Sequence, residues 1–340
     1  MWLAQSTRAT ATGGQYMTAV CALDVGTTRV KALLLTEQLL PGPPIAGPSV
    51  LRAPGPGAAE VDAEALWGQT LAILRTVAAN SPGIEALAIS NQRATLFRVD
   101  DGGQPLGPGL SWQDRRGGQA LGAWLAEVGA HRFSQVTGLV PSTLWSVAKV
   151  LWWRQQGLLN GARVATVQDW ALRRLGAQEW VLDQANASLT GLLDIRSLAW
   201  DADLMQAAGL TRTQLPDLAP SGVRIGELAA EVAQATGLPA GLPLVLGGGN
   251  QQCATLGGGA AQPDGASVDL GTAGVVDVPG ERVIIDPQGR LVSVAHVVRG
   301  QWLLEGLEST YGGAYRWGGE LLGDDLVGQA AGSPPGSRGL

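Results

Sequence analysis

The sequence predicts an α/β protein built from two similar domains. From Ala19 to Leu35 two apolar runs flank a glycine-containing loop, which is typical of two short buried strands joined by a tight turn. The sequence of this first loop, Asp24-Val25-Gly26-Thr27-Thr28, is echoed far along the chain by a second loop, Asp269-Leu270-Gly271-Thr272-Ala273-Gly274, again between apolar runs. Because a repeated loop indicates a repeated unit, we expect two such hairpins to face each other across a cleft.

Composition narrows the class of protein. The chain has 340 residues, 45% of them hydrophobic and 15% charged, which is typical of a globular protein with a substantial core. A net charge of -6 argues against a nucleic-acid binder or a binder of anionic membranes, since both need a basic surface. Two cysteines, Cys21 and Cys253, cannot form a disulfide framework, and no apolar run is long enough to span a bilayer. A cytoplasmic location is expected.

Regular structure is predicted to begin after an N-terminal extension. Residues 1–16 show no strand pattern and no apolar core of a signal peptide, so we expect them to be disordered and Met17 to be the true start. Further on, Asp62 is the expected cap of a helix, and the run from Ile84 to Ile89 reads as a buried strand. A turn at 100–103 then leads to the segment around Trp112.

Helices are expected to dominate from there to about residue 176, one of them beginning after the capping candidate Ser142. A second α/β segment opens with a strand at Leu242–Leu246, which leads through three glycines to Asn250 and an apolar helix. We therefore expect a disordered extension at 1–16, a first domain at 17–240 and a second domain at 241–340.

The first loop has the chemistry of a phosphate-binding site. Gly26 lets the backbone approach an anion closely, and the hydroxyls of Thr27 and Thr28 can donate to phosphate oxygens. Asp24 would then face a metal ion, for which Mg²⁺ is the natural choice beside phosphates, and Lys31 adds a positive charge. A plain hairpin turn explains the first loop about as well when it is taken alone.

Two further polar segments suit a sugar. Ser90-Asn91-Gln92-Arg93 ends a predicted strand, and Trp112 opens a second polar segment that runs to Arg116. Gln92 and Arg93 could hydrogen-bond neighbouring hydroxyls while the Trp112 indole covers an apolar ring face. The alternative is that Arg93 forms a surface ion pair and Trp112 packs in the core.

Other candidates point to ordinary structural roles. His131 and His296 are the only histidines, and neither has the neighbours of a metal site. Trp145, Trp152 and Trp153 lie within a helical pattern and are expected in the core rather than at a ligand.

Together these segments resemble the FGGY carbohydrate kinases, a group within the actin and hexokinase-like ATPases that includes glycerol kinase, xylulokinase and ribulokinase. The similarity is collinear and covers most of the chain. Beyond the two loops, the Asn91-Gln92-Arg93 strand end and Trp112-Gln113-Asp114-x-Arg116, it rests on Asp183-x-x-Asn186-Ala187-Ser188-x-Thr190, Leu193-Asp194-Ile195, Trp200-Asp201, Leu304-Glu305-Gly306, Gly312-Gly313 and Trp317.

The resemblance implies a two-domain, ribonuclease H-like fold with an incomplete second domain, and phosphoryl transfer from ATP with Mg²⁺ in the cleft. It assigns nucleotide binding to Asp24, Gly26, Thr27, Thr28, Lys31, Gly271, Thr272 and Gly274, sugar binding to Gln92, Arg93, Trp112, Asn250 and Gln251, catalytic roles to Asp24 and Asn250, and the metal to Asp24. We expect a sugar or polyol and ATP as partners, no nucleic acid and no membrane, and we leave a homo-oligomer open.

The chain departs from the family pattern in two respects. The family has Gly-Asp-Gln where this chain has Gly249-Asn250-Gln251, and a neutral amide cannot take the proton from the attacking hydroxyl. Asp269 stands where the family has a small polar residue, and Ala94 stands where glycerol kinase has a glutamate that holds glycerol, so a pentulose such as ribulose or xylulose is favoured. The chain is also shorter than family members, which usually carry a further adenosine-binding motif.

Three functions follow from these features. The first is an ATP-dependent sugar kinase whose turnover Asn250 and the short C-terminal domain would impair. The second is a catalytically inactive sugar or nucleotide binder, acting as a sensor or an assembly subunit. The third is a phosphatase or a bare ATPase, which the sugar-binding segments disfavour.

Overall fold

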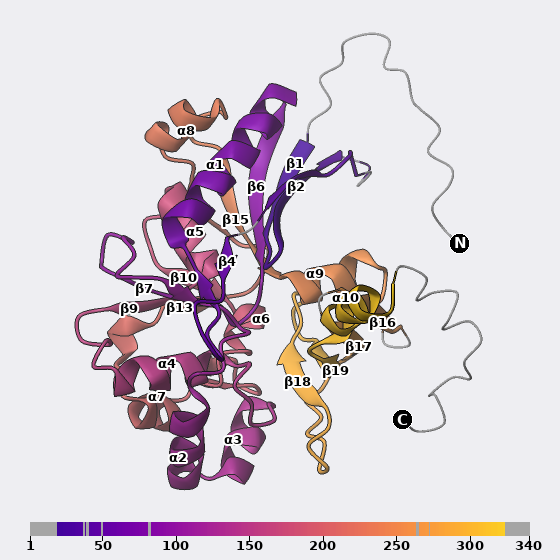
Figure 1. Ribbon diagram of the computed structural model, residues 1–340. Coiled ribbons are helices and arrows are strands. Elements are labelled where there is room, and N and C mark those ends of the chain that lie inside the picture. Colours follow the sequence, from indigo (N-terminus) through magenta and orange to yellow (C-terminus); the bar gives the residue numbers. More distant parts are fainter. Residues whose placement is uncertain are drawn as a thin grey trace.

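The computed structural model of the chain describes residues 19–36, 38, 41–48, 50–80, 83–262, 265–271 and 273–323. They form a large body on a six-stranded sheet and a smaller unit on a four-stranded sheet (Figure 1). The α/β class predicted from the sequence is confirmed. The predicted extension at 1–16, and Met17 with it, lies outside the described residues.

The six-stranded sheet is the frame of the large body. Its strands are β1 (Ala19–Val25), β2 (Arg29–Thr36), β3 (Ile45–Pro48), β6 (Ile84–Asn91), β14 (Arg224–Glu227) and β15 (Pro243–Gly249). They lie in the order β14-β15-β6-β1-β2-β3, with β6 parallel to both β1 and β15. The carboxyl ends of these three parallel strands therefore meet at one edge, where the first loop and the Gln92 segment emerge.

Helices bury one side of this sheet because its strands are apolar on that side. These helices are α1 (Ala63–Asn80), α5 (Val167–Leu175) and α8 (Ala230–Thr236), which Figure 1 shows beside β6 and β15. Leu23, Leu87 and Trp170 are fully buried in the resulting core. As predicted, Asp62 caps α1, since its Oδ1 accepts a hydrogen bond of 3.0 Å from the Ala65 amide.

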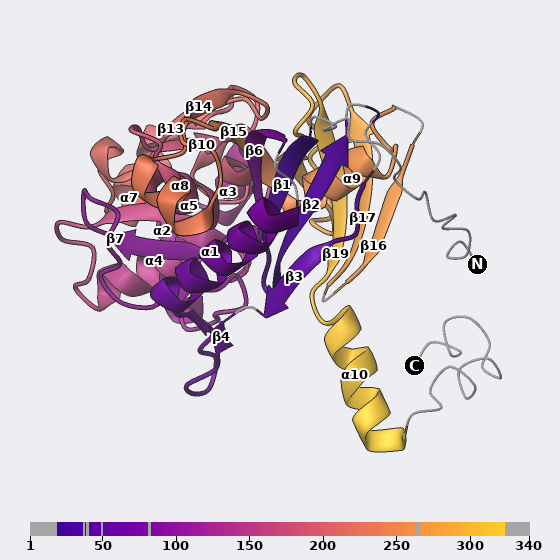
Figure 2. The same cartoon turned by 90° about the horizontal axis from the view of Figure 1, so that it is seen from above.

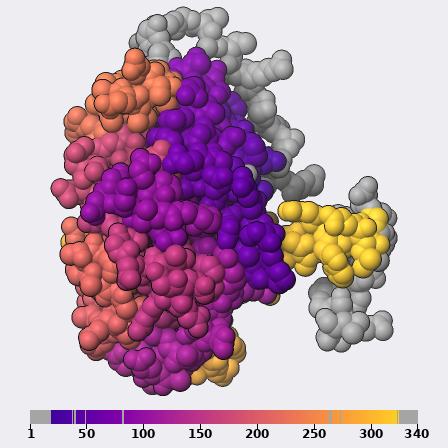
Figure 3. Space-filling view, turned by 60° about the vertical axis from the view of Figure 1, so that its left-hand side comes forward, coloured from indigo at the N-terminus to yellow at the C-terminus, as the bar shows by residue number. Residues whose placement is uncertain are grey.

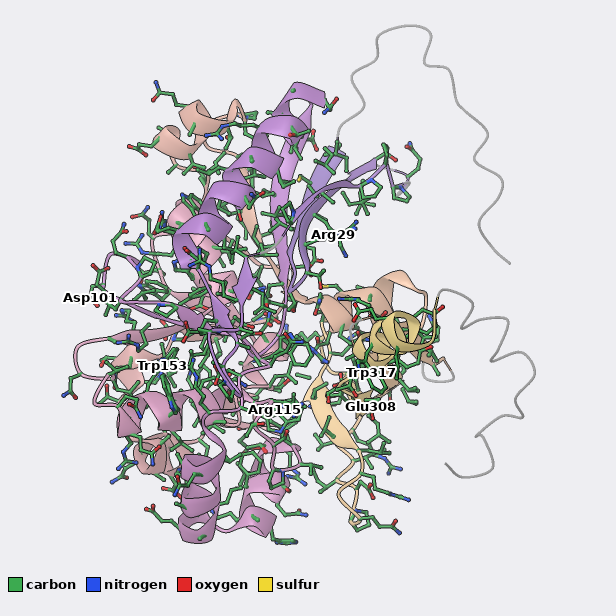
Figure 4. All side chains as sticks on the ribbon, viewed as in Figure 1. Arg29, Asp101, Arg115, Trp153, Glu308 and Trp317 are labelled. Carbon is green, nitrogen blue, oxygen red and sulfur yellow. The ribbon has the colours of Figure 1, made fainter. Side chains whose placement is uncertain are left out.

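A second core lies among helices of the same body. It is formed mainly by α2 (Gly118–Val128), α3 (Ala130–Thr137), α4 (Ser146–Gln155) and α7 (Ala202–Ala208). Trp153 is buried in this core, as predicted, and Figure 4 places it among these helices. The helix expected after Ser142 begins instead at Ser146, because the Ser142 hydroxyl accepts from the Leu144 amide and closes a turn ahead of the helix.

Shorter elements complete the large body. A five-stranded sheet contains β4 (Leu51–Arg52), β5 (Glu60–Val61), β7 (Leu96–Val99), β8 (Gly109–Leu110) and β9 (Arg163–Thr166). Two strand pairs and two short helices follow: β10 (Val181–Asp183) with β13 (Asp217–Ala219), β11 (Leu193–Asp194) with β12 (Ala199–Trp200), α6 (Gln184–Ala187) and the 3-10 helix η1 (Arg212–Gln214).

The four-stranded sheet has one buried face and one exposed face. Its strands are β16 (Ser267–Leu270), β17 (Gly274–Gly280), β19 (Trp302–Glu308) and β18 (Val292–Ala295), in that order across the sheet. Val275 and Asp277 are buried on the inner face, whereas Val268 and Val276 are exposed on the outer face. The helix α10 (Tyr311–Leu322) follows and extends away from both sheets, as Figures 2 and 3 show.

The strand predicted at 242–246 forms as β15 but pairs with β6, so it belongs to the first sheet. The helix α9 (Asn250–Gly257) follows it directly. A domain boundary between residues 240 and 241, as the sequence predicts, would separate β15 from its sheet. We propose instead that the boundary between the two domains lies between α9 and β16. No helix in the described part of the chain is long and apolar enough to cross a membrane.

Candidate functional site

A pocket of about 480 Å³ lies where the edge of the first sheet meets the inner face of the second. This volume is in the range of small-molecule sites. The first loop and its flanks contribute Asp24, Gly26, Thr27, Thr28, Arg29 and Lys31; the second loop contributes Asp269, Gly271 and Ala273; the remaining walls are Gln92, Arg93, Ala94, Trp112, Leu144, Trp145, Leu189, Asn250, Gln251, Val275 and Leu307. The two loops predicted to face each other therefore line one cavity.

Both loops join two antiparallel strands. The first loop connects β1 to β2, and the second connects β16 to β17. Gly26 donates its amide hydrogen to the Arg29 carbonyl at 3.1 Å, and a Cβ at Gly26 would lie only 2.7 Å from that oxygen. The tight turn of the first loop therefore requires glycine. Figure 4 shows Arg29 beside β1 and β2, near the junction with the second sheet.

Asp24 presents its carboxylate to the pocket from the end of β1. Its Oδ2 lies 3.9 Å from the Lys31 ammonium, and its Oδ1 accepts a long hydrogen bond of 3.5 Å from the Ser90 hydroxyl. Burial raises the pKa of Asp24 above its usual value, while Lys31 and Ser90 oppose the shift. A bound cation would favour the charged carboxylate in the same way as Lys31 does.

A hydrogen-bond network ties the first loop to the segments predicted to bind sugar. The Gln92 amide donates to the Gly26 carbonyl at 3.2 Å, and its oxygen accepts from the hydroxyls of Thr27 and Thr95 at 3.2 and 2.9 Å. The Trp112 indole donates to the Thr27 hydroxyl at 2.9 Å. Because Gln92 is buried and its side chain makes these three hydrogen bonds, it fixes the first loop against the pocket wall.

Arg93 connects the two sheets. Its guanidinium donates to both carboxylate oxygens of Glu305 on β19, at 2.5 and 3.0 Å, and the Glu305 side chain is fully buried. Burial acts to lower the pKa of Arg93, but Glu305, Asp277 and Asp269 together raise it above its ordinary value. Arg93 is therefore a buried ion-pair partner as well as a wall of the pocket, rather than the surface ion pair of the alternative interpretation.

Asn250 is the first residue of α9, at the strand-to-helix junction predicted for it. Its side-chain oxygen accepts a hydrogen bond from the backbone amide of Gln251 at 3.0 Å. The Gln251 side chain and the Thr255 hydroxyl donate to Oδ2 of Asp277 at 2.9 and 2.7 Å. Burial, with repulsion from Glu305, raises the pKa of Asp277 to about 6. These contacts hold the start of α9 against the second sheet.

Most predicted site residues meet in this pocket, and among the described ones only Gly274 does not line it. Thr272 lies outside the described residues. Gly274 begins β17, where a Cβ would lie 3.3 Å from Tyr311 of α10, so it faces that helix. No cluster of three or more His, Cys, Asp or Glu side chains suited to a metal ion occurs among the described residues.

Several pocket residues were not singled out from the sequence. Trp145 was expected in the core, and it is buried, but it also lines the pocket, as do the apolar residues Leu144 and Leu189. Apolar walls carry no distinctive signal in a sequence. Arg29 could have been identified, because it directly follows the first loop. The hydrogen bonds between Asp277 and α9 could not have been identified, because Asp277 lies far from that helix in the sequence.

The comparisons with known proteins agree with this geometry. Residues 19–257 match the sequence profile described as the FGGY family of carbohydrate kinases, N-terminal domain. The chain is 33% identical to a glycerol kinase of Thermus brockianus and 28% identical to a xylulose kinase of Klebsiella pneumoniae, in each case over 88% of its own length. It spans only 63% and 62%, respectively, of the length of these two relatives.

Solved structures show the same fold. The xylulose kinase from Rhodospirillum rubrum superposes with a TM-score of 0.85 and 27% identity, covering 94% of this chain and 68% of that one. A ligand-bound xylulose kinase from Lactobacillus acidophilus gives a TM-score of 0.87 at 22% identity, covering 95% and 68%. These matches confirm the predicted fold, and this chain spans about two thirds of each of the two structures.

Proposed function

The chain belongs to the FGGY family of carbohydrate kinases, and from this we propose that it binds ATP and transfers the terminal phosphoryl group to a hydroxyl of a sugar or polyol. The observation that carries the proposal is the convergence of the two glycine-containing loops on one pocket that also holds Gln92, Arg93 and Trp112. A pocket with phosphate-binding loops and a polar, partly aromatic wall suits both substrates at once.

The loops support binding of the ATP phosphates. Gly26 and Gly271 leave the backbone accessible, and Thr27 and Thr28 line the pocket beside them. Lys31 and Arg29 add positive charge to the same wall. Phosphoryl transfer asks a protein mainly to position its reactants and neutralise charge, which these groups are suited to do.

The residues present fit a magnesium ion. Asp24 offers a carboxylate to the pocket, and Mg²⁺ commonly takes one or two carboxylates together with water and phosphate oxygens. Asp24 would be its main protein ligand, as predicted. When bound, the ion would neutralise negative charge on the phosphates.

A pentulose is our proposed acceptor. Ala94, which lines the pocket, has no polar side chain with which to hold a small triol such as glycerol. Trp112, Trp145 and Leu189 offer apolar surface to the carbon edge of a larger sugar. The xylulose kinases among the relatives and solved structures support this choice, whereas the glycerol kinases among the relatives make glycerol the competitor to test.

Asn250 makes an inactive sugar or nucleotide binder the second candidate, because an amide cannot accept the acceptor's proton. Asp269 is a candidate replacement: it lines the same pocket and, within the described residues, its carboxylate has no hydrogen bond or ion pair of its own. We therefore propose Asp269 as the carboxylate on which any turnover of this chain would depend.

A coupled assay of ADP release across ribulose, xylulose and glycerol separates these proposals. Turnover with a pentulose supports the kinase, and its loss in Asp269→Asn supports the replacement base. Turnover that appears only in Asn250→Asp, by about 10²-fold or more, indicates a decayed kinase. If calorimetry detects sugar or ATP binding and neither form turns over, the inactive binder is correct. Phosphate release without any sugar would favour a bare ATPase. The cytoplasmic location and the homo-oligomer stay predictions.

A further inference from the structure

A buried lysine lies behind the wall of the pocket that contains Trp112. Lys149 belongs to α4, and only 1% of its surface is exposed. Its ammonium donates to the backbone carbonyls of Thr143 at 2.5 Å, Leu144 at 2.8 Å and Trp112 at 3.1 Å, and it lies 3.4 Å from the carbonyl of Trp145. An ammonium has three hydrogens to donate, so all of them are engaged by the backbone.

The carbonyls come from two segments that are far apart in the sequence. Trp112 precedes the other three by about thirty residues in the chain, yet all four oxygens converge on one nitrogen. The side chains of Trp112, Leu144 and Trp145 all line the pocket. One ammonium therefore holds together the two backbone segments that supply these pocket-lining side chains.

The contact also reaches the first loop. Lys149 binds the backbone carbonyl of Trp112, and the indole of the same residue donates to the Thr27 hydroxyl. The Trp112 amide in turn donates to the Thr95 hydroxyl, which donates to Gln92. A shift of the Trp112 backbone would thus move the group that fixes the Thr27 hydroxyl in the pocket.

A buried ammonium is costly unless its hydrogens find partners. The charged group that acts on Lys149 is Asp114, which is itself engaged by Arg116 and by the Ala59 amide. Burial lowers the pKa of Lys149 to about 7. An apolar side chain of similar length would fill the space at lower cost, but it could not draw four carbonyl oxygens together.

We propose that Lys149 is a positioning residue for the acceptor end of the pocket, which clamps the Trp112 segment to the 143–145 segment. The effect of Lys149 on sugar binding rests on the function proposed above. The contact that it makes between the two backbone segments does not. The two parts can therefore be tested separately.

The test uses Lys149→Met in the full chain, with Val150→Ala on the same helix as the control. Val150 is fully buried but has no part in the pocket, so its truncation reports a general loss of packing. Hydrogen exchange is followed in peptides that contain residues 112–116 and 143–148, and in the β6 peptide as a reference. We expect Lys149→Met to exchange about tenfold faster in the first two peptides only, since a hydrogen bond to a charged group is lost there.

The second readout is kinetic, or calorimetric if the chain does not turn over. With xylulose and Mg²⁺-ATP as probes, we expect the KM or Kd for xylulose to rise about tenfold in Lys149→Met, with kcat and the constant for ATP changed less than about threefold. The same rise in Val150→Ala would mean that Lys149 is merely structural and would overturn the proposal. So would unchanged exchange in Lys149→Met.

Two further outcomes are covered by the design. If Lys149→Met does not fold, Lys149→Gln replaces it, because the glutamine amide has two N–H donors and can hold only some of the carbonyls. Partial loss of protection in the same two peptides supports the clamp, and wild-type exchange there refutes it. If no form binds or turns over any sugar, the proposed kinase function fails, while the exchange result still decides the role of Lys149.

Discussion

The two hairpins that carry the loops are alike in sequence and differ in how they are supported. In the β1–β2 hairpin, Leu23, Val25 and Val30 are fully buried beneath the covering helices. In the β16–β17 hairpin, Val268 and Leu270 are each 62% exposed, and the outer face of the sheet also exposes Val276 and Val278. The first loop is thus held by a complete core, whereas the second is held mainly through its inner face.

The inner face of the second sheet is held by apolar side chains of β18 and β19, which pack in the second core, and by polar contacts. Arg93 pairs with Glu305, and Asp277 accepts from Gln251 and Thr255. Polar contacts fix orientation strictly, but each depends on both partners being present. The difference teaches that the first half of the pocket is positioned mainly by packing, whereas the second half depends on a few buried polar groups as well as on packing.

The largest effect is expected where the second sheet joins the first. Arg93→Met leaves the Glu305 carboxylate buried without its cation, so we expect a loss of about 3–5 kcal/mol in the free energy of unfolding. Urea unfolding followed by tryptophan fluorescence would measure it. The control is Arg224→Met, which removes an exposed pair with Glu227 and should cost no more than about 1 kcal/mol. Equal costs would mean that the junction does not depend on this pair.

The next effect compares a buried leucine of the first hairpin with an exposed leucine of the second. Leu23→Ala removes fully buried side-chain volume and should cost about 3 kcal/mol or more. Leu270→Ala removes a side chain that is largely exposed and should cost less than about 0.5 kcal/mol. Both values come from chemical unfolding under the same conditions. A cost near 3 kcal/mol for Leu270→Ala would show that the outer face is covered in solution.

A smaller, pH-dependent effect is expected at Asp277. The Asp277 carboxyl has its usual pKa of 3.8 in the unfolded chain and a pKa of about 6 in the folded chain. Protonation of Asp277 therefore favours the folded state. The stability that Asp277 contributes should therefore fall as the pH rises from about 4 to above 6, by about 3 kcal/mol at most. Asp277→Asn should flatten this part of the pH profile of unfolding, whereas Asp203→Asn, at an exposed site, should leave it unchanged.

The smallest effect concerns the glycines of the loops. A Cβ at Gly26 would lie 2.7 Å from the Arg29 carbonyl, whereas at Gly271 the nearest atom within the described residues is 3.6 Å away. Gly26→Ala should cost about 1–2 kcal/mol because backbone must shift, and Gly271→Ala should be nearly neutral. Thermal unfolding of both variants would measure this. A larger loss for Gly271→Ala would reverse the comparison.

Prediction from the sequence succeeded for features that depend on neighbouring residues. The two loops, the cap at Asp62 and the junction at Asn250 were all located, because each depends on a turn, a cap or a change of period within a few residues. The helix start after Ser142 was misplaced by a few residues, since a serine can close a turn as readily as it caps a helix.

Local patterns thus located the two loops and the polar segments that line the pocket, and the motifs in them resemble the family that the comparisons confirm. The partners of the side chains were decided by the packing of distant segments: Arg93 with Glu305, Asp277 with Gln251, and Lys149 with the carbonyl of Trp112. The same packing placed β15 in the first sheet. The physical reason is that hydrogen bonds and ion pairs act over a few ångströms in space, and only the folded chain brings these groups within that range.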